Sequence, residues 1–245
     1  MIAVARGSGE GDRLRIAIPK GALFEGSVAA LASAGLDVAA LADPGRQLII
    51  ATADAEFVIA KPTDVPIYVA YGGADCGIAG RDVLVETRLD VVELVDLGFG
   101  GCRFVVAGPE RAGDLDERYG HLGVLRVATK YPNIAQAHFD DRGVQVELVK
   151  LNGNIELAPL IGIADVIVDI TATGTTLRQN GLRILEDVLP STARFIGNPV
   201  AVRTDARVTE LADALASLSV ESETGAAENP GGTRPNPDDE SERSR

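Results

Sequence analysis

The segment from Asp165 to Leu177 holds the densest group of side chains that could take part in chemistry. It reads Asp-Val-Ile-Val-Asp-Ile-Thr-Ala-Thr-Gly-Thr-Thr-Leu: an apolar run that ends at Asp169, then small residues, then a predicted helix that begins near Thr175. Converging backbone N–H groups, threonine hydroxyls and a helix N-terminus can together bind a phosphate without a cationic side chain. The segment therefore predicts a phosphate site, although an ordinary strand-to-helix turn capped by threonine would show the same pattern.

Within this segment, small residues and hydroxyls would contact the phosphate while a carboxylate would contact a sugar. Gly174 and Ala172 leave room for a close approach to the backbone. Asp169, at the carboxyl end of its strand, can accept hydrogen bonds from ribose hydroxyls beside the phosphate. The predicted loop residues are Thr171, Ala172, Thr173, Gly174, Thr175 and Thr176.

The elements that must position this loop alternate between strand and helix along most of the chain. Several predicted strands, such as residues 14–18 and 165–168, are continuously apolar rather than alternating. That pattern is typical of mainly parallel sheets covered by helices on both faces. Roughly ten strands over about 210 residues fit two α/β lobes better than one sheet. We therefore expect an α/β fold of two lobes with mainly parallel sheets around a central cleft.

Changes in composition predict the limits of the two lobes. Residues 13–101 together with 192–220 are expected to form the first lobe, and residues 102–191 the second, which carries the phosphate loop. Residues 1–12 contain the run Gly-Ser-Gly-Glu-Gly and show no periodicity, and the acidic tail, residues 221–245, contains almost no apolar side chains. The tail can bury too little surface to offset its conformational entropy, and both segments are expected to be disordered.

Composition argues against several classes of protein. A net charge of −13 is unlike a nucleic-acid-binding protein. No apolar run reaches the roughly 18 residues of a membrane span, and residues 1–12 do not resemble a signal peptide, so a cytoplasmic location is expected. Two cysteines, Cys76 and Cys102, do not make a disulfide framework or a zinc site. The two histidines, His121 in a predicted loop and His138 on a predicted helix surface, are too few for a histidine metal site.

Blocks over about residues 14–198 resemble, in the same order, the ATP phosphoribosyltransferase family. The matching blocks include residues 18–21, 61–66, 74–82, 97–100 and 129–132. The most specific match follows the spacing of the family signature. Its residues are Glu156, Gly162, Ala164, Ile167, Asp169, Ile170, Thr173, Gly174, Thr176 and Leu177.

The resemblance implies an enzyme that joins N1 of ATP to C1 of phosphoribosyl pyrophosphate (PRPP) and releases pyrophosphate, the first step of histidine biosynthesis. It implies that Asp169 and residues 171–176 hold the ribose and 5′-phosphate of PRPP, with Glu156 close by, which makes Glu156 and Asp169 the catalytic candidates. Adenine N1 bears no proton, so catalysis needs substrate alignment and charge stabilisation rather than a strong base. Mg²⁺ is expected to arrive on the pyrophosphate and not in a protein cage.

For ATP, the resemblance points to the residues Lys20, Gly21, Lys61, Asp82 and Val83. Lys20 follows the first strand and suits a pyrophosphate or triphosphate, unless it is only a solvated surface residue. Lys61 stands where some relatives carry arginine, so a bidentate contact with the nucleotide would be replaced by a point charge. Asp82 either contacts the nucleotide or caps a helix. Lys130 and Tyr131 either line the cleft or merely start a helix.

Two other functions remain open. A purine- or pyrimidine-salvage phosphoribosyltransferase also places PRPP on an Asp-then-Thr/Gly loop. Those enzymes usually carry two adjacent acids there, whereas Val168 precedes Asp169 in this chain. A two-lobed small-ligand-binding protein of the type II periplasmic kind would share the expected architecture, but it would have no use for a phosphate loop.

The C-terminal part of the sequence bears on partners. The last strand–helix unit is predicted to end near Leu218, and the polar residues beyond it cannot form another core. Longer members of the family carry a regulatory domain at this point. The resemblance therefore implies a short-form enzyme with a separate regulatory subunit, similar to a histidyl-tRNA synthetase catalytic domain. The two would form a hetero-oligomer that histidine inhibits.

Overall fold

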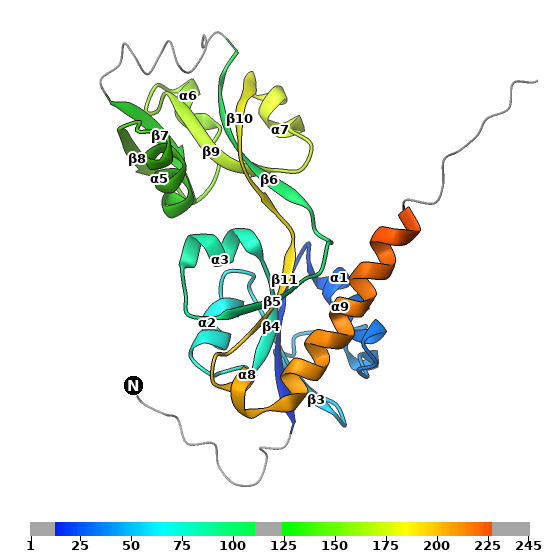
Figure 1. The fold of residues 1–245 in the computed structure, drawn as a ribbon. Coiled ribbons are helices and arrows are strands. Elements are labelled where there is room, and N and C mark those ends of the chain that lie inside the picture. Colours follow the sequence, from blue (N-terminus) through cyan, green and yellow to red (C-terminus); the bar gives the residue numbers. More distant parts are fainter. Residues whose placement is uncertain (1–12, 111–123, 227–245) are drawn as a thin grey trace, which may run out of the picture.

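The computed structural model describes residues 13–110 and 124–226 and arranges them in two lobes (Figure 1). The N-terminal segment expected to be disordered, the greater part of the acidic tail and His121 lie outside the described residues. Each lobe is a sheet with helices packed against it, so the predicted two-lobed α/β class is confirmed.

The first lobe is built on a six-stranded sheet with the order β2-β3-β1-β4-β11-β5. Its strands are β1 (Leu14–Pro19), β2 (Ile49–Ala51), β3 (Ala55–Ala60), β4 (Cys76–Gly80), β5 (Val92–Asp96) and β11 (Ala193–Gly197). Its helices are α1 (Phe24–Ser33), the 3-10 helix η1 (Ala39–Leu41), α2 (Val65–Ala70), α3 (Arg81–Thr87), α8 (Ala201–Thr204) and α9 (Ala206–Ala226).

The second lobe is built on a five-stranded sheet with the order β10-β6-β9-β7-β8. Its strands are β6 (Cys102–Pro109), β7 (Leu125–Thr129), β8 (Val146–Lys150), β9 (Val166–Thr171) and β10 (Leu182–Ser191). Its helices are α5 (Pro132–Asp141), α6 (Leu157–Leu160) and α7 (Thr175–Gln179).

Both sheets are mixed, although most strands of each point the same way. In the first sheet β1, β3, β4 and β5 share a direction, against β2 and β11. In the second sheet β7, β8, β9 and β10 share a direction, against β6. The prediction of mainly parallel sheets therefore holds for strand direction. It misses the antiparallel pairings. These arise because β6 and β11 each lie between strands of the majority direction, and because the edge strand β2 pairs antiparallel with β3.

The continuously apolar strands do bury side chains on both faces. Along β1, Ile16 and Ile18 belong to one buried cluster of the first lobe, whereas Ala17 belongs to another. Along β9, Val166 and Val168 face one cluster of the second lobe while Ile167 faces the other. Because successive residues of a strand point to opposite faces, this division confirms that helices cover both sides of each sheet.

The chain crosses between the lobes twice, at residues 97–101 and at Thr192, and the two crossings are hydrogen-bonded to each other. Leu97 N donates to Ala193 O at 2.9 Å, and Ala193 N donates to Phe99 O at 2.9 Å. The Thr192 hydroxyl adds a bond to Asp96 at 2.8 Å. The antiparallel pairing of β5 with β11 thus continues directly into that of β6 with β10.

Two expectations about local structure are wrong. The acidic tail was expected to be disordered from residue 221, but α9 continues to Ala226. The residues added include glutamate and alanine, which favour helices, and extending a formed helix avoids the cost of nucleation. His138 was expected on the surface, but its side chain is only 10% exposed and its Nε2 lies 3.0 Å from a carboxylate oxygen of Glu186.

In the part of the chain that the structure describes, no helix is both long enough and apolar enough to cross a bilayer.

Gly77 provides a test of the tight packing between β1 and β4. A Cβ atom at this position would lie 2.8 Å from the Ala17 carbonyl oxygen and 3.1 Å from Cγ1 of Val65. We expect Gly77→Ala to lower the free energy of unfolding by about 1–3 kcal/mol, because backbone must move to make room. Urea denaturation measures the loss. Gly101→Ala is the control, since no atom lies within 4 Å of its added Cβ; equal stability of the two variants would contradict the packing argument.

Candidate active site

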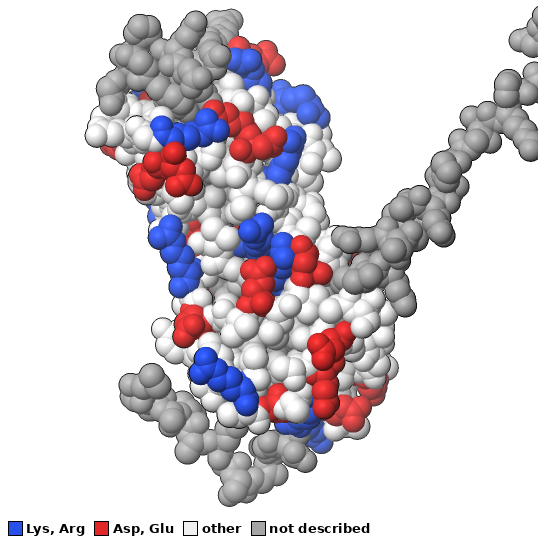
Figure 2. All heavy atoms as spheres, viewed as in Figure 1, with Lys and Arg blue, Asp and Glu red and all other residues white. Residues whose placement is uncertain are grey.

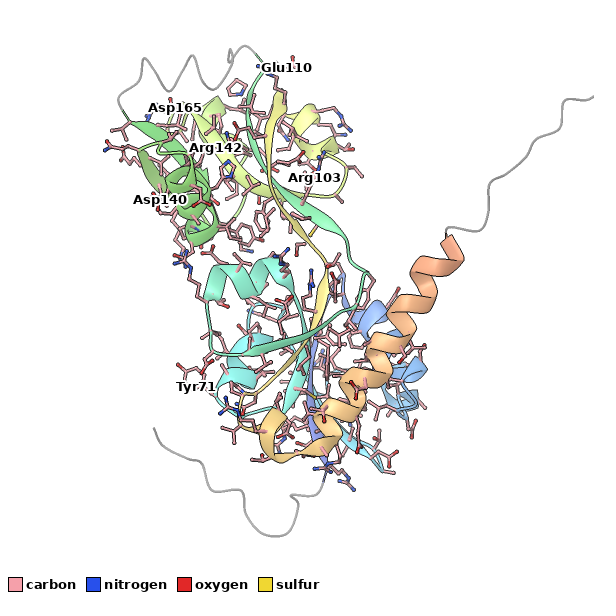
Figure 3. The ribbon with its side chains drawn as sticks, viewed as in Figure 1. Tyr71, Arg103, Glu110, Asp140, Arg142 and Asp165 are labelled. Carbon is pink, nitrogen blue, oxygen red and sulfur yellow. The ribbon has the colours of Figure 1, made fainter. Side chains whose placement is uncertain are left out.

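Three neighbouring parallel strands of the second lobe end at the same edge of its sheet. In the order β9-β7-β8, they bring Asp169, Lys130 and the turn leading to Glu156 to that edge. The register pairs Thr129 with Val168, so the residues that follow, Lys130 and Asp169, lie level with each other. Asp165, at the opposite end of β9, marks the outer end of the lobe in Figure 3. The carboxyl ends of parallel strands are where α/β sheets place ligands.

The Asp169 carboxyl is the most perturbed acid at this edge. Burial raises its pKa, and the nearby Glu156 carboxylate raises it further, while the Ile170 N–H at 2.8 Å and the charge of Lys130 lower it. The resulting pKa is about 6. Near neutral pH the carboxyl group is mostly ionised. A ligand that donates hydrogen bonds to it would stabilise this ionised form.

The residues after Asp169 form the compact loop expected from the sequence. Gly174 has a φ of 71°, which favours glycine, and its N–H donates to the Thr171 hydroxyl at 2.8 Å. The hydroxyls of Thr173 and Thr175 are 2.9 Å apart, and both side chains are exposed, as is that of Thr176. The loop therefore exposes three threonine side chains at the start of α7, while the N–H groups of Gly174 and Thr175 donate to hydroxyls within the loop.

The loop also contains a cation that sequence reasoning missed. Arg178, one turn into α7, donates to the Thr173 carbonyl oxygen and to the Thr175 hydroxyl, each at 3.1 Å. The prediction of a phosphate site without positive charge is thus incomplete, and α7, with five residues, supplies only a small helix dipole. The spacing of three residues between Thr175 and Arg178 on a predicted helix was the available signal.

The lysines predicted for ATP meet at the carboxyl edge of the first sheet. Pro19 is paired with Ala60 in register, and Lys20 N donates to Ala60 O at 2.7 Å, so Lys20 and Lys61 follow adjacent strand ends. Both side chains are exposed. Lys20 and Gly21 also line a cavity of about 510 Å³ between α1 and the turn before β2.

Asp82 and Val83 lie at the start of α3, close to the crossing between the lobes. The Asp82 carboxylate accepts from the Ser191 hydroxyl at 3.1 Å and makes no hydrogen bond that caps α3. The capping alternative for Asp82 is therefore wrong. The Val83 side chain is 6% exposed, so only its backbone could meet a nucleotide.

Tyr131 connects the two groups of candidates. Its ring packs edge-on against the ring of Phe104, with the two ring centroids 4.8 Å apart. Burial, then the carboxylates of Asp82 and Asp169, raise the pKa of its hydroxyl, so these acids from different lobes lie near one side chain. Tyr131, the N-cap residue of α5, thus lies in the region between the lobes, and Lys130 precedes it and lies near Asp169. On the face shown in Figure 2, basic and acidic atoms lie side by side at this waist, so the acidic chain does not present a purely negative surface there.

Replacing Asp169 by asparagine tests the electrostatic cost of the site. A carboxyl pKa raised from about 3.9 to about 6 penalises the folded state once the group ionises, so the penalty is absent below pH 4, grows between pH 4 and 6 and is constant above. We expect Asp169→Asn to be more stable than the parent by about 1–3 kcal/mol at pH 7.5, and equally stable at pH 4.

Urea denaturation at the two pH values measures this difference. Asp90→Asn, which removes an exposed carboxylate, is the control and should change stability little at either pH. An Asp169→Asn protein no more stable than the parent at pH 7.5 would contradict the assigned electrostatics.

Comparisons with known proteins identify the family of this chain. Residues 61–217 match the HisG family model, described as ATP phosphoribosyltransferase. An ATP phosphoribosyltransferase of Rubrobacter xylanophilus is 48% identical over 85% of this chain and 96% of its own length. One from Bacillus licheniformis is 49% identical over 87% of this chain and 98% of its own.

Solved structures give the same result. A chain of the ATP phosphoribosyl transferase (HisG:HisZ) complex from Thermotoga maritima is 32% identical, with a TM-score of 0.72 over 85% of this chain and 99% of that one. The VFT2 domain of BvgS from Bordetella pertussis, at 15% identity and a TM-score of 0.52 over 88% of this chain and 91% of that one, shares the two-lobed fold alone. The family named by the sequence blocks is confirmed: this chain belongs to the ATP phosphoribosyltransferase family.

Proposed function

We propose that PRPP binds to the loop of the second lobe and ATP to the carboxyl edge of the first sheet, so that the two react between the lobes. The family reaction is a pentosyl transfer that joins N1 of ATP to C1 of PRPP in the first step of histidine biosynthesis. The observation that carries the assignment of PRPP is the convergence of Asp169, Glu156 and Lys130 beside the threonine loop. This edge offers acceptors for ribose hydroxyls and donors for a phosphate within one short stretch.

The reaction needs alignment more than proton transfer. The bond between C1 and the pyrophosphate oxygen breaks while that between C1 and adenine N1 forms, so positive charge develops on the ribose and negative charge on the leaving group. Asp169, ionised above its pKa of about 6, would hold ribose hydroxyls and face the growing positive charge. Lys20 and Lys61, exposed at the facing sheet edge, would attract the phosphate groups. Holding both substrates in line supplies most of the rate gain in such a site.

We also propose that Mg²⁺ enters on the pyrophosphate of PRPP. The ion prefers phosphate oxygens with one or two carboxylates nearby and keeps several waters. Asp169 and Glu156 fit that preference, since the Glu156 carboxylate disfavours the ionised form of Asp169 and a cation would relieve that repulsion. When bound, Mg²⁺ would neutralise charge on the leaving pyrophosphate.

Substitutions in the loop test the PRPP assignment. We expect Asp169→Asn and Thr173→Ala each to lower kcat/KM for PRPP roughly 10- to 100-fold, since each loses a hydrogen bond with a charged partner. Formation of phosphoribosyl-ATP from ATP, PRPP and Mg²⁺ is the assay. Thr209→Ala serves as the control: it removes a hydroxyl from α9 that, among the described residues, donates to Ala206 O. Parental kcat/KM in both loop variants would show that PRPP binds elsewhere.

We propose further that the chain works with a separate regulatory subunit similar to a histidyl-tRNA synthetase catalytic domain. The support is its likeness to one chain of the HisG:HisZ complex of Thermotoga maritima; the match covers 99% of that chain. In such a hetero-oligomer the partner would carry the response to histidine.

Reconstitution tests this partnership. We expect the isolated chain to be poorly active and insensitive to histidine, and addition of the partner to restore both the rate and the inhibition. Initial rates with and without each component measure the effect. A fully active chain that histidine inhibits without any partner would contradict the proposal while leaving the chemistry untouched.

A further inference from the structure

Helix α5 of the second lobe has its N-terminus capped by a residue of the first lobe. The N-cap residue Tyr131 makes no side-chain capping bond, and Pro132 has no N–H. The next two N–H groups, of Asn133 and Ile134, donate to the Glu86 carboxylate at 3.1 and 3.0 Å. These are the positions at which an N-cap side chain normally accepts. Glu86 belongs to α3, so an acid of one lobe completes a helix of the other.

Other bonds tie the same two helices together. The side-chain amide of Asn133 donates to the Glu86 carbonyl oxygen at 2.8 Å, so residues 86 and 133 are joined in both directions. Arg88, which ends α3 with a φ of 52°, donates to the Asn133 carbonyl oxygen at 3.4 Å. Val85 packs against a buried cluster of the second lobe. Figure 1 shows α3 facing α5 across the waist.

This contact lies beside the groups proposed to bind the substrates. Lys130 and Tyr131 immediately precede α5, and Asp82 lies one turn before Glu86 on α3. Moving α5 away from α3 would therefore separate Asp82 and the edge of the first sheet from Asp169 and the phosphate loop. The contact therefore helps to set the distance between the groups proposed for ATP and those proposed for PRPP.

We propose that Glu86 is a positioning residue whose bonds to the N-terminus of α5 latch the two lobes in the arrangement that aligns ATP with PRPP. The kinetic part of this inference rests on the proposed function, whereas the latch itself does not. Each substrate would be bound largely by one lobe, so loss of the latch would leave binding of PRPP alone nearly unchanged. Turnover would fall, because the reaction needs both substrates held in line.

Three variants test the latch. Glu86→Ala removes the acceptor, Glu86→Gln keeps an oxygen without the charge, and Asn133→Ala removes the reverse bond from the second lobe. Glu147→Gln removes an exposed carboxylate on β8 and is the matched control. Far-UV circular dichroism and thermal melting establish that each variant is folded.

The structural measurements need no substrate. We expect Glu86→Ala to speed amide hydrogen exchange at Asn133 and Ile134 about 10-fold or more, and to increase the radius of gyration in small-angle X-ray scattering. Asn133→Ala should increase the radius in the same way, with a smaller effect for Glu86→Gln and none for Glu147→Gln. Parental exchange and scattering in Glu86→Ala would overturn the latch, whatever reaction the chain catalyses.

The kinetic measurement tests positioning. With the regulatory partner present, we expect Glu86→Ala to lower kcat about 10-fold while the Kd for PRPP alone changes less than 2-fold. Glu86→Gln should recover part of kcat. An unchanged kcat despite altered exchange and scattering would refute the positioning role. A parent protein that makes no phosphoribosyl-ATP would instead refute the proposed function and leave the latch standing.

Discussion

The hydrogen bonding between the two crossing segments is the interaction on which the rest of the structure depends. Through Leu97, Ala193 and Phe99 it joins two sheets that share no other strand pairing among the described residues. Because β6 and β10 leave the first lobe side by side, the second lobe is held by a ribbon and not by a single flexible linker. A ribbon of two paired strands allows fewer relative movements of the lobes than a single linker would.

Local patterns predicted the parts of the site that neighbouring residues build. The strand that carries Asp169, the tight loop at Gly174 and the helix that begins at Thr175 all arise within a short segment, so sequence alone was enough, although β9 runs two residues beyond the predicted end. The apolar runs likewise predicted sheets covered on both faces. The roles of these residues in binding and catalysis stay predictions until they are measured.

Contacts between distant segments were beyond that reach. Glu86 sits on a short helix with nothing local to distinguish it from a solvated glutamate, and its partners lie 47 and 48 residues away. The exposure of His138 was predicted wrongly for the same reason, since its partner Glu186 lies on β10, 48 residues further along the chain. The common direction of most strands was predictable from the apolar runs. The antiparallel insertion of β11 between β4 and β5, in contrast, depends on tertiary packing.

The electrostatics of the site oppose the stability of the free protein. Burying Asp169 near Glu156, with Lys130 as the nearby cation, disfavours the charged form that a ribose would use. A site organised in advance for a ligand commonly carries such a cost in its absence. Ligand binding would then return stability by occupying groups that the empty protein leaves poorly solvated.

The position of β11 in the middle of the first sheet also dictates an order of folding. The second lobe, residues 102–191, is inserted between β5 and β11, so the first sheet lacks an interior strand until the whole insertion has been made. The inserted lobe has all its own strands in one continuous stretch and can form first. Closing it brings β11 back beside β4 with a much shorter effective loop, which lowers the entropic cost of that pairing. During synthesis the edge of β4 therefore stays unpaired until the second lobe and β11 have been made.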